Sequence, residues 1–304
     1  MKRIVVTGAT GLIGKKLVDS LIKMKYEVIA FSRNAEKAKL LLPDANKFVS
    51  WDYTKPNEWR SEIENSFAII HLAGNNLFEK RWNEKFKSKI LESRELSTRN
   101  LIEAVKSSTN KPGVFICASG IGIYGDRADE LLKEESLNGN DFLADVCKVW
   151  ENESRKVEEF GVRSVQIRTG LVLSTEDGAL KQMLPAFKFF VGGPLGSGKQ
   201  WSSWLHIDDI VKIYLYALEG NSISGPVNAV SPNPVTMWEF AKTLGKVLNR
   251  PSIFPVPKFV LKLVIGEAAE VVTASQKVVP DKLIKCGYKF KFDNIETALR
   301  DLLK

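Results

Sequence analysis

Three glycines near the start of the chain are spaced for binding a dinucleotide. Gly8, Gly11 and Gly14 follow a short β-branched run from Lys2 to Thr7 and precede a helical pattern that begins at Leu12. In such a turn the first glycine permits a tight bend, the second lets a pyrophosphate approach the backbone, and the third lets helix and strand pack closely. The free N–H groups at the helix start then face the phosphates. The segment therefore predicts a dinucleotide site.

The end of the second predicted strand, Glu27 to Phe31, indicates which nicotinamide cofactor this site would take. An NAD site places a carboxylate about twenty residues past the glycines, where it holds the adenosine ribose hydroxyls. This chain has Ser32, Arg33 and Asn34 there instead. Because a guanidinium forms strong, charge-assisted hydrogen bonds to a phosphate, Ser32 and Arg33 predict NADP(H) with its 2′-phosphate. The alternative is a surface arginine at a strand end.

The elements that must position these residues alternate between strands and helices. Further strands are expected at 47–50, 68–72, 114–117 and 164–168, and long helices at 83–105 and 141–159. Strands that alternate with helices of this length predict an α/β fold, a Rossmann-type doubly wound parallel sheet with helices on both faces.

The last third of the chain has shorter segments, which predict a second, smaller α/β lobe. We expect residues 1–170 to form the NADP(H)-binding domain and residues 171–304 to form the C-terminal lobe. The lobe would pack on the carboxyl edge of the sheet and close a cleft there, where ligands bind in open α/β sheets. Residues 193–200 match the GxxxxGK pattern of a P-loop, but they lack its Ser/Thr and follow a helix, so a loop that closes the lobe is expected instead.

Charge and composition exclude several classes of protein. The 304 residues carry a net charge of +8, and the first fifty hold ten basic and four acidic side chains. Basic residues are scattered among acidic ones along the chain, so a solvated surface is expected and nucleic-acid binding is not. The local excess fits an anionic small molecule near the N-terminus. The most apolar stretch, 259–272, is interrupted by three charged residues, so no membrane span is expected.

The cysteines and histidines are too few and too widely spaced for a disulfide framework or a metal centre. Cys117, Cys147 and Cys286 are an odd number, and His71 and His206 are the only histidines. This usage predicts a reducing, cytoplasmic location and no metal site.

The motifs together resemble those of the extended short-chain dehydrogenases/reductases. Within that group the chain is similar to an uncharacterised "epimerase family" branch, labelled NAD-dependent epimerase/dehydratase. The segments that carry this resemblance are 8–14, Leu72-Ala73-Gly74-Asn75, Arg81-Trp82, Glu92-Ser93-Arg94, 118–125, 192–198, 204–209 and a C-terminal module of unassigned function from about Pro251. The resemblance covers essentially the whole chain.

The resemblance implies a set of cofactor-binding residues. Those against the pyrophosphate would be Gly8, Thr10, Gly11, Leu12 and Ile13, with Gly14 completing the turn. Ser32 and Arg33 would hold the 2′-phosphate, Asp52 would approach the adenine, and Leu72, Ala73 and Gly74 would pass under the ribose. Arg94 would point back at the cofactor. The alternatives are a turn residue for Asp52 and a surface salt bridge for Arg94.

The acid/base pair of this superfamily is missing from its usual place. The superfamily uses a Ser and a YxxxK pair, in which the Lys lowers the pKa of the Tyr from its free value of about 10. The aligned positions here hold Leu143 and Cys147, and Lys148 lies about 100° around the helix. Cys147 is expected to be a small apolar filler rather than a nucleophile.

Other polar residues could substitute for that pair. We expect Ser119 and Tyr124 to lie at the carboxyl end of the fifth strand and to face the cleft, with Tyr124 as proton donor and Ser119 orienting the substrate oxygen. Arg168 would supply a nearby positive charge, bind an anionic substrate, or form a structural ion pair. His206 and Asp208 are expected to be structural, with Asp208 capping a helix.

Two functions are compatible with these residues. The first is an NADP(H)-dependent oxidoreductase or nucleotide-sugar-epimerase-like enzyme that acts on an unknown small molecule with non-standard acid/base residues. The alternative is an NADP(H)-binding sensor with little or no turnover. Either would be a cytoplasmic monomer or homodimer.

Overall fold

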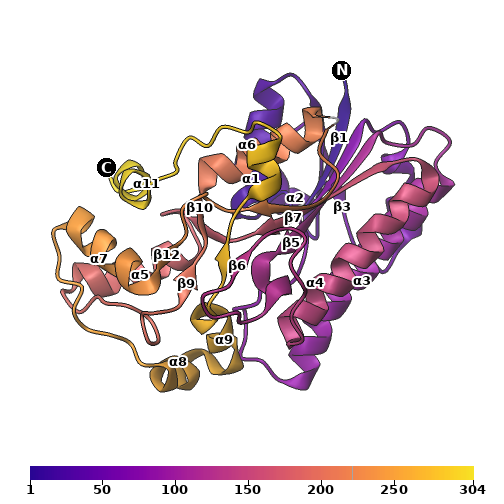
Figure 1. Ribbon diagram of the computed structural model, residues 1–304. Helices are drawn as coiled ribbons and strands as arrows, with labels where there is room; N and C mark the ends of the chain where they lie inside the picture. Colours follow the sequence, from indigo (N-terminus) through magenta and orange to yellow (C-terminus); the bar gives the residue numbers. More distant parts are fainter. Residues whose placement is uncertain (221) are drawn as a thin grey trace.

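Seven parallel strands form the central sheet of the computed structural model, which describes residues 1–220 and 222–304 (Figure 1). The strands are β1 (Arg3–Thr7), β2 (Glu27–Ser32), β3 (Lys47–Ser50), β4 (Ala68–His71), β5 (Val114–Gly120), β7 (Arg163–Thr169) and β11 (Gly225–Ala229). They lie in the order β11-β7-β5-β4-β1-β2-β3. The order reverses between β1 and β4, and the carboxyl ends of strands diverge at such a point to leave room for a ligand.

The two faces of the sheet are both covered, which explains the continuous apolar runs of its strands. Helices α1 (Leu12–Lys23) and α6 (Ile207–Glu219) pack on one face, where Leu17 and Ile210 join the core. Helices α3 (Glu84–Ser107) and α4 (Phe142–Arg155) cover the other face, as Figure 1 shows. The predicted Rossmann-type fold is confirmed.

The remaining helices have twelve residues or fewer. The helices are α2 (Ala35–Leu41), α5 (Ala179–Lys188), α7 (Met237–Leu248), α8 (Lys258–Ile265), α9 (Ala269–Thr273), α10 (Asp281–Lys285) and α11 (Ile295–Leu302). Three strand pairs lie outside the main sheet: β6 (Leu131–Leu132) with β13 (Lys277–Val278), β8 (Leu171–Leu173) with β10 (Trp204–His206), and β9 (Trp201–Ser202) with β12 (Val235–Thr236).

The C-terminal part of the chain has its own core. Leu184 of α5, Phe240 of α7 and Leu299 of α11 pack around Trp204, which is fully buried. Two elements beyond residue 170 nevertheless belong to the large layer, because β11 pairs with β7 and α6 packs against α1. The large layer therefore extends past residue 170, and the division into two domains as such stays a prediction.

Several element boundaries differ from those expected. The helix predicted at 141–159 is α4 followed by a 3-10 turn, Lys156–Phe160. The helix expected before residue 193, for which no bounds were predicted, is α5, and it contains Pro185, a residue that normally ends a helical pattern. The P-loop-like segment follows α5 as a loop against residues 254–256, which explains its glycines: a Cβ at Gly193 would collide with the backbone of Phe254.

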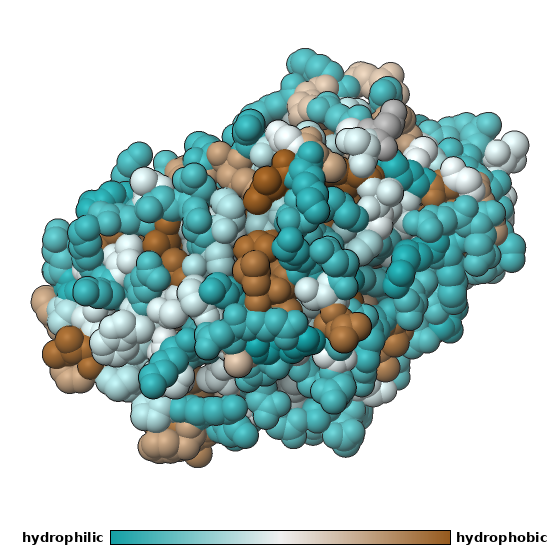
Figure 2. All heavy atoms as spheres, viewed as in Figure 1, coloured by the Kyte–Doolittle hydropathy of each residue, from teal (hydrophilic) through white to brown (hydrophobic). Residues whose placement is uncertain are grey.

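The surface is largely polar. Figure 2 shows hydrophilic residues over most of one face, with apolar ones in small groups. Within residues 1–220 and 222–304, no helix is both long and apolar enough to cross a bilayer.

Candidate functional site

The turn between β1 and α1 is built on backbone contacts that only glycine allows. Gly8 has a φ of 66°, and a Cβ there would lie 2.9 Å from the backbone nitrogen of Ala73. A Cβ at Gly14 would lie 2.7 Å from the carbonyl oxygen of Ala9. The outer two glycines therefore hold the strand, the helix and the end of β4 together, as predicted for the first and third positions of the motif.

Gly11 has a different role, because an added Cβ there would meet a single neighbouring atom. Its φ of −74° suits any residue, and the nearest atom to an added Cβ would be the oxygen of Gly8 at 3.3 Å. Helix α1 begins directly after it, with no capping side chain and no acidic residue in its first turn. The N–H groups at this helix start can therefore receive an anion.

A segment from the C-terminal part of the chain contacts the start of α1. Lys16 of α1 forms an ion pair of 3.0 Å with Glu176, and a Cβ at Gly178 would lie 3.8 Å from the Leu12 side chain. The segment before α5 therefore lies beside the glycine turn.

The end of β2 presents an arginine to solvent. Arg33 is exposed, and none of the ion pairs in the described chain includes it. The next residue, Asn34, caps α2 by accepting a hydrogen bond from the Lys37 N–H (2.8 Å). Ser32 is half-buried and its Oγ accepts only a long 3.4 Å hydrogen bond from the Asn34 N–H. Arg33 and Ser32 thus have groups free for a ligand.

Asp52, just after β3, is held in a turn. Its Oδ1 accepts hydrogen bonds from the backbone N–H of Thr54 (3.0 Å) and from the Thr54 hydroxyl (2.7 Å). These bonds hold the pKa of Asp52 below its usual value. The structure thus agrees with the alternative of a turn residue, and contact with an adenine stays a prediction.

The residues after β4, Leu72 to Gly74, form a wall beside the glycine turn. The N–H of Ala73 donates to the Thr7 hydroxyl (3.3 Å), so Leu72, Ala73 and Gly74 run past the end of β1. Their backbone lies against Gly8, as its contact with Ala73 requires. This arrangement brings the predicted ribose-binding segment beside the predicted pyrophosphate turn.

His71, the last residue of β4, is fully buried beneath this wall. Its Nδ1 lies 2.6 Å from the Thr7 hydroxyl, and its Nε2 lies 3.1 Å from the hydroxyls of Ser97 and Thr98. Burial, together with the nearby charge of Arg94, lowers its pKa to about 3. His71 is therefore neutral at pH 7 and is suited to positioning rather than to proton transfer.

The buried His71 should make the protein acid-sensitive. Its pKa is about 3 in the folded chain and 6.5 when unfolded, so its contribution to stability is full above pH 6.5 and is lost as pH falls toward 3. Between pH 7 and pH 5 the loss should be about 2 kcal/mol. Urea unfolding at both pH values checks this. His71→Gln should remove that part of the pH dependence, and an unchanged dependence would contradict the assignment.

Arg94 of α3 lies next to Gly74. Its guanidinium donates to the carbonyl oxygens of Asn75 (3.3 Å) and Ile90 (3.0 Å) and lies 4.9 Å from the centre of the Trp150 ring. A Cβ at Gly74 would lie 3.0 Å from its Cζ. Arg94 is thus partly buried at the wall of the site, and the expected alternative of a surface salt bridge is wrong.

Ser119 and Tyr124 do not face a cleft, and that expectation must be corrected. Tyr124 is fully buried; its hydroxyl donates to Oδ1 of Asn228 (2.7 Å) and accepts from Nη1 of Arg168 (2.9 Å). Burial raises its pKa to about 12. Ser119 is buried as well and donates to Oε1 of Glu151 (2.7 Å). Because both side chains are buried, the structure does not support the direct catalytic roles expected for Tyr124 and Ser119.

Arg168 is the centre of this buried network. Its Nε and Nη2 donate to the two carboxylate oxygens of Glu151 at 2.8 and 2.9 Å, and Nη1 also donates to the Glu134 carbonyl (2.9 Å). The alternative of a structural ion pair is confirmed. Glu151 was not predicted, because a single glutamate on a helix gives no signal of a buried partner on another element.

Apolar groups occupy the aligned acid/base positions. A Cβ at Gly122 would lie 3.4 Å from Cβ of Leu143, and one at Gly120 would lie 3.8 Å from Sγ of Cys147. Burial raises the pKa of Cys147 to about 11, so it is a protonated thiol, as expected of a filler. Lys148 does not replace the missing lysine, because its ammonium group donates instead to the Gly139 carbonyl (3.3 Å).

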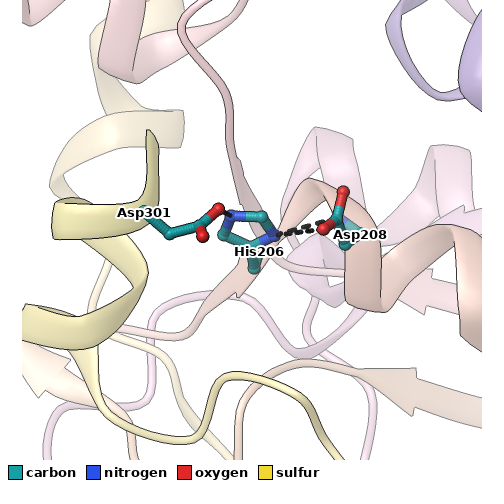
Figure 3. A group of neighbouring side chains, drawn as sticks. All are labelled: His206, Asp208 and Asp301. Carbon is teal, nitrogen blue, oxygen red and sulfur yellow. Dashed lines mark hydrogen bonds and ion pairs between the residues drawn. The ribbon is translucent and has the colours of Figure 1, made fainter. Parts of the chain in front are cut away.

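A second cluster of polar side chains lies in the C-terminal part of the chain (Figure 3). His206 lies between Asp208 and Asp301, with Nδ1 to Oδ2 at 3.9 Å and Nε2 to Oδ2 at 3.5 Å. Nδ1 accepts from the Asp208 N–H (3.0 Å), so His206, and not Asp208 as predicted, caps α6. Asp208 also binds Lys291 (2.9 Å). Nδ1 and the Asp208 carboxylate therefore both have partners. The cluster links α11, which carries Asp301, to the start of α6, which His206 caps.

Two family models match this chain. The model of the NAD dependent epimerase/dehydratase family matches residues 4–229, and that of a domain of unknown function, DUF1731, matches residues 256–302. The chain belongs to the NAD dependent epimerase/dehydratase family. The predicted family, and the module expected from about Pro251, are confirmed for this epimerase-family chain.

Relatives of this epimerase-family chain match it over nearly its whole length. "Epimerase family protein SDR39U1 homolog, chloroplastic" of Arabidopsis thaliana is 38% identical over 98% of this chain and 86% of its own. "Epimerase family protein YfhF" of Bacillus subtilis is 36% identical over 99% and 97%. The crystal structure of human epimerase family protein SDR39U1 (isoform 2) with NADPH has a TM-score of 0.87 at 31% identity and covers 99% of this chain and 98% of its own.

Proposed function

We propose that the chain binds NADP(H) at the carboxyl edge of its sheet and acts as an oxidoreductase or epimerase-like enzyme on a small molecule. One observation carries the choice of cofactor: Arg33, exposed and outside every ion pair of the described chain, stands where an NAD site needs a carboxylate. The human relative whose crystal structure contains NADPH supports the same choice.

The residues of the site fit such a cofactor. The open backbone at Gly11 and the uncapped start of α1 suit a pyrophosphate. Arg33 and Ser32 suit the 2′-phosphate, and Gly74 ends the wall along which a ribose would lie. The bound cofactor would supply or accept a hydride.

The chain's own contribution to this chemistry is to bind and orient the cofactor and the substrate. Tyr124 and Ser119 are committed to a buried network, and Leu143 and Cys147 carry no usable acid or base. Protonation of a substrate oxygen therefore falls to a water molecule in the cleft or to the substrate itself. We expect slow turnover with simple aldehydes and ketones for this reason.

A sensor of the NADPH/NADP⁺ ratio is the second candidate. The observation that favours it is the burial of Tyr124, which removes the best proton donor from the cleft. A screen of carbonyl compounds, followed at the NADPH absorbance, separates the two candidates. An active compound supports the enzyme, whereas tight NADPH binding with no turnover across the screen supports the sensor.

Replacing Arg33 by alanine should weaken NADPH binding by about 1.5–3 kcal/mol, because a hydrogen-bonded charge on the 2′-phosphate is lost. Binding of NADH, which lacks that phosphate, should barely change. Calorimetric titration of both nucleotides measures the two effects. Lys39→Ala removes an exposed charge from neighbouring α2 and should leave both affinities unchanged. An equal loss for NADH and NADPH would refute the role of Arg33.

A further inference from the structure

Helix α8 is strongly apolar, yet it buries none of its side chains. Six of its eight residues, Lys258–Ile265, are apolar. Phe259 and Leu263 are each 72% exposed, and Val264 is 64% exposed. A helix of a folded protein normally packs one apolar face on the core. The apolar side chains of α8 therefore lack such a partner within the described chain.

Polar contacts hold α8 in place instead. Arg81, in the segment before α3, donates hydrogen bonds to the carbonyl oxygens of Leu263 and Val264. Glu267, directly after α8, forms an ion pair of 2.5 Å with Lys87 of α3. These contacts use the backbone and the polar flank of the helix. The helix is thus anchored while its apolar side chains stay in solvent.

A second group of exposed apolar side chains lies next to α8 along the chain. Each member is at least half exposed, and the group consists of Phe189, Phe190, Val191, Ile253 and Phe254. Its two segments lie side by side, because the Phe254 N–H donates to the Gly192 carbonyl (3.2 Å) and the Arg250 guanidinium lies 4.5 Å from the centre of the Phe190 ring. Figure 1 shows the segment between α7 and α8 along the outer edge of the C-terminal part. Residues 186–199 and 249–265, the edge segments, therefore carry both apolar groups.

The charges of the edge segments all have one sign. The two segments contain no Asp or Glu, and their five basic residues are Lys188, Lys199, Arg250, Lys258 and Lys262. Of these five, Lys262 alone belongs to an ion pair of the described chain, with Glu270 at 3.6 Å. The edge segments thus combine exposed apolar side chains with a positive charge.

This combination fits an anionic bilayer better than it fits a protein. A second copy of the chain would bring a second set of like charges to the contact, which is unfavourable. Protein interfaces are rich in Tyr, Trp and Met and poor in Lys, whereas the edge segments have four Lys and none of those three residue types. At a membrane surface, Phe, Leu and Val enter the boundary between headgroups and acyl chains, and Lys faces anionic headgroups.

We propose that the edge segments bind the surface of an anionic lipid bilayer, with α8 lying in the plane of the interface. The binding is peripheral, since α8 has only eight residues. None of the edge residues belongs to the proposed cofactor site, so the proposal goes beyond the proposed function and does not depend on it.

Co-sedimentation of the full chain with lipid vesicles tests the proposal. One set of vesicles contains equal parts of phosphatidylcholine and phosphatidylglycerol, and the other contains phosphatidylcholine alone. The unmodified protein should bind the anionic vesicles at least about tenfold more tightly, because several unpaired cations face the negative surface. Raising the salt from about 0.1 M to about 1 M should remove most of that preference.

Variants in each apolar group test whether both contact the bilayer. Phe259→Ser with Leu263→Ser, and separately Phe189→Ser with Phe190→Ser, should each weaken binding to anionic vesicles by about tenfold or more. The matched control is Leu40→Ser, which removes an 84% exposed leucine from α2 and should leave binding unchanged. Circular dichroism checks that each variant is folded.

Replacing charges separates the electrostatic contribution from the apolar one. Lys188→Gln with Lys258→Gln should weaken binding to anionic vesicles by about tenfold or more and should reduce its salt dependence. Lys39→Gln, which removes an exposed charge from α2, should do neither.

Three results would overturn the proposal. The first is no binding of the unmodified protein to anionic vesicles, a comparison that needs no variant and so does not depend on how the variants fold. The second is equal binding to both kinds of vesicle. The third is a dimer of the unmodified chain that Phe259→Ser with Leu263→Ser dissociates, without binding to vesicles, because the edge segments would then be an interface between copies. Binding of NADPH is measured separately, and its failure would refute only the proposed function.

Discussion

Gly11→Val is expected to abolish NADPH binding while the protein stays folded. A Cβ at Gly11 would have one close neighbour, the Gly8 oxygen at 3.3 Å, and the backbone there suits any residue. The branched side chain would occupy the space in which a pyrophosphate must approach the N–H groups of α1. Calorimetry should detect no NADPH binding, and circular dichroism should match that of the unmodified protein.

Two other glycines provide the comparison. Gly113→Val, at the opposite end of the sheet, adds a side chain whose Cβ would lie 3.8 Å from its nearest neighbour, so it should fold and bind NADPH normally. Gly14→Val should fail to fold, because its Cβ would be forced against the backbone of Ala9. NADPH affinity that is unchanged in Gly11→Val would place the phosphates elsewhere.

Arg168→Met is expected to destabilise the protein by about 3–5 kcal/mol, the usual cost of leaving one partner of a buried ion pair uncompensated. The carboxylate of Glu151 is 1% exposed and receives two of its three hydrogen bonds from Arg168. Tyr124 and the Glu134 carbonyl would lose a donor as well. Urea denaturation measures the free energy of unfolding.

The more exposed pair Arg127–Glu130, with side chains 24% and 48% accessible, is the control for this prediction. Arg127→Met should cost less than about 1 kcal/mol, because a solvated ion pair contributes little. The double variant Arg168→Met with Glu151→Leu should recover part of the lost stability, since no charge is then left buried. If Arg168→Met unfolds with the same free energy as the unmodified protein, the network does not stabilise the fold.

The parts of the site that could be predicted from sequence are those fixed by backbone geometry. Glycines at three set positions between a strand and a helix require a particular turn, and the structure has that turn at Gly8, Gly11 and Gly14. Strand β2 ends at Ser32, so Ser32 and Arg33 were correctly predicted to lie at its carboxyl end. The six strands predicted up to residue 168 all exist.

The errors concern side chains whose partners are distant in the chain. Tyr124 follows β5 closely, and its position alone suggested that it faces the cleft. Its direction depends on Asn228 and Arg168, which lie more than forty residues away: the Tyr124 hydroxyl donates to Asn228 and accepts from Arg168. For Arg94 only the alternative of a surface salt bridge is wrong, since backbone carbonyls and Trp150 hold its guanidinium, which sequence alone could not show. Its contact with a cofactor stays a prediction.

Paired calorimetric titrations of NADPH and NADH into the unmodified protein test the central claim most directly. The account predicts one site per chain, tighter binding of NADPH by at least about tenfold, and a preference that weakens as salt screens the Arg33–phosphate contact. Equal affinities for the two nucleotides, or no binding of either, would contradict it.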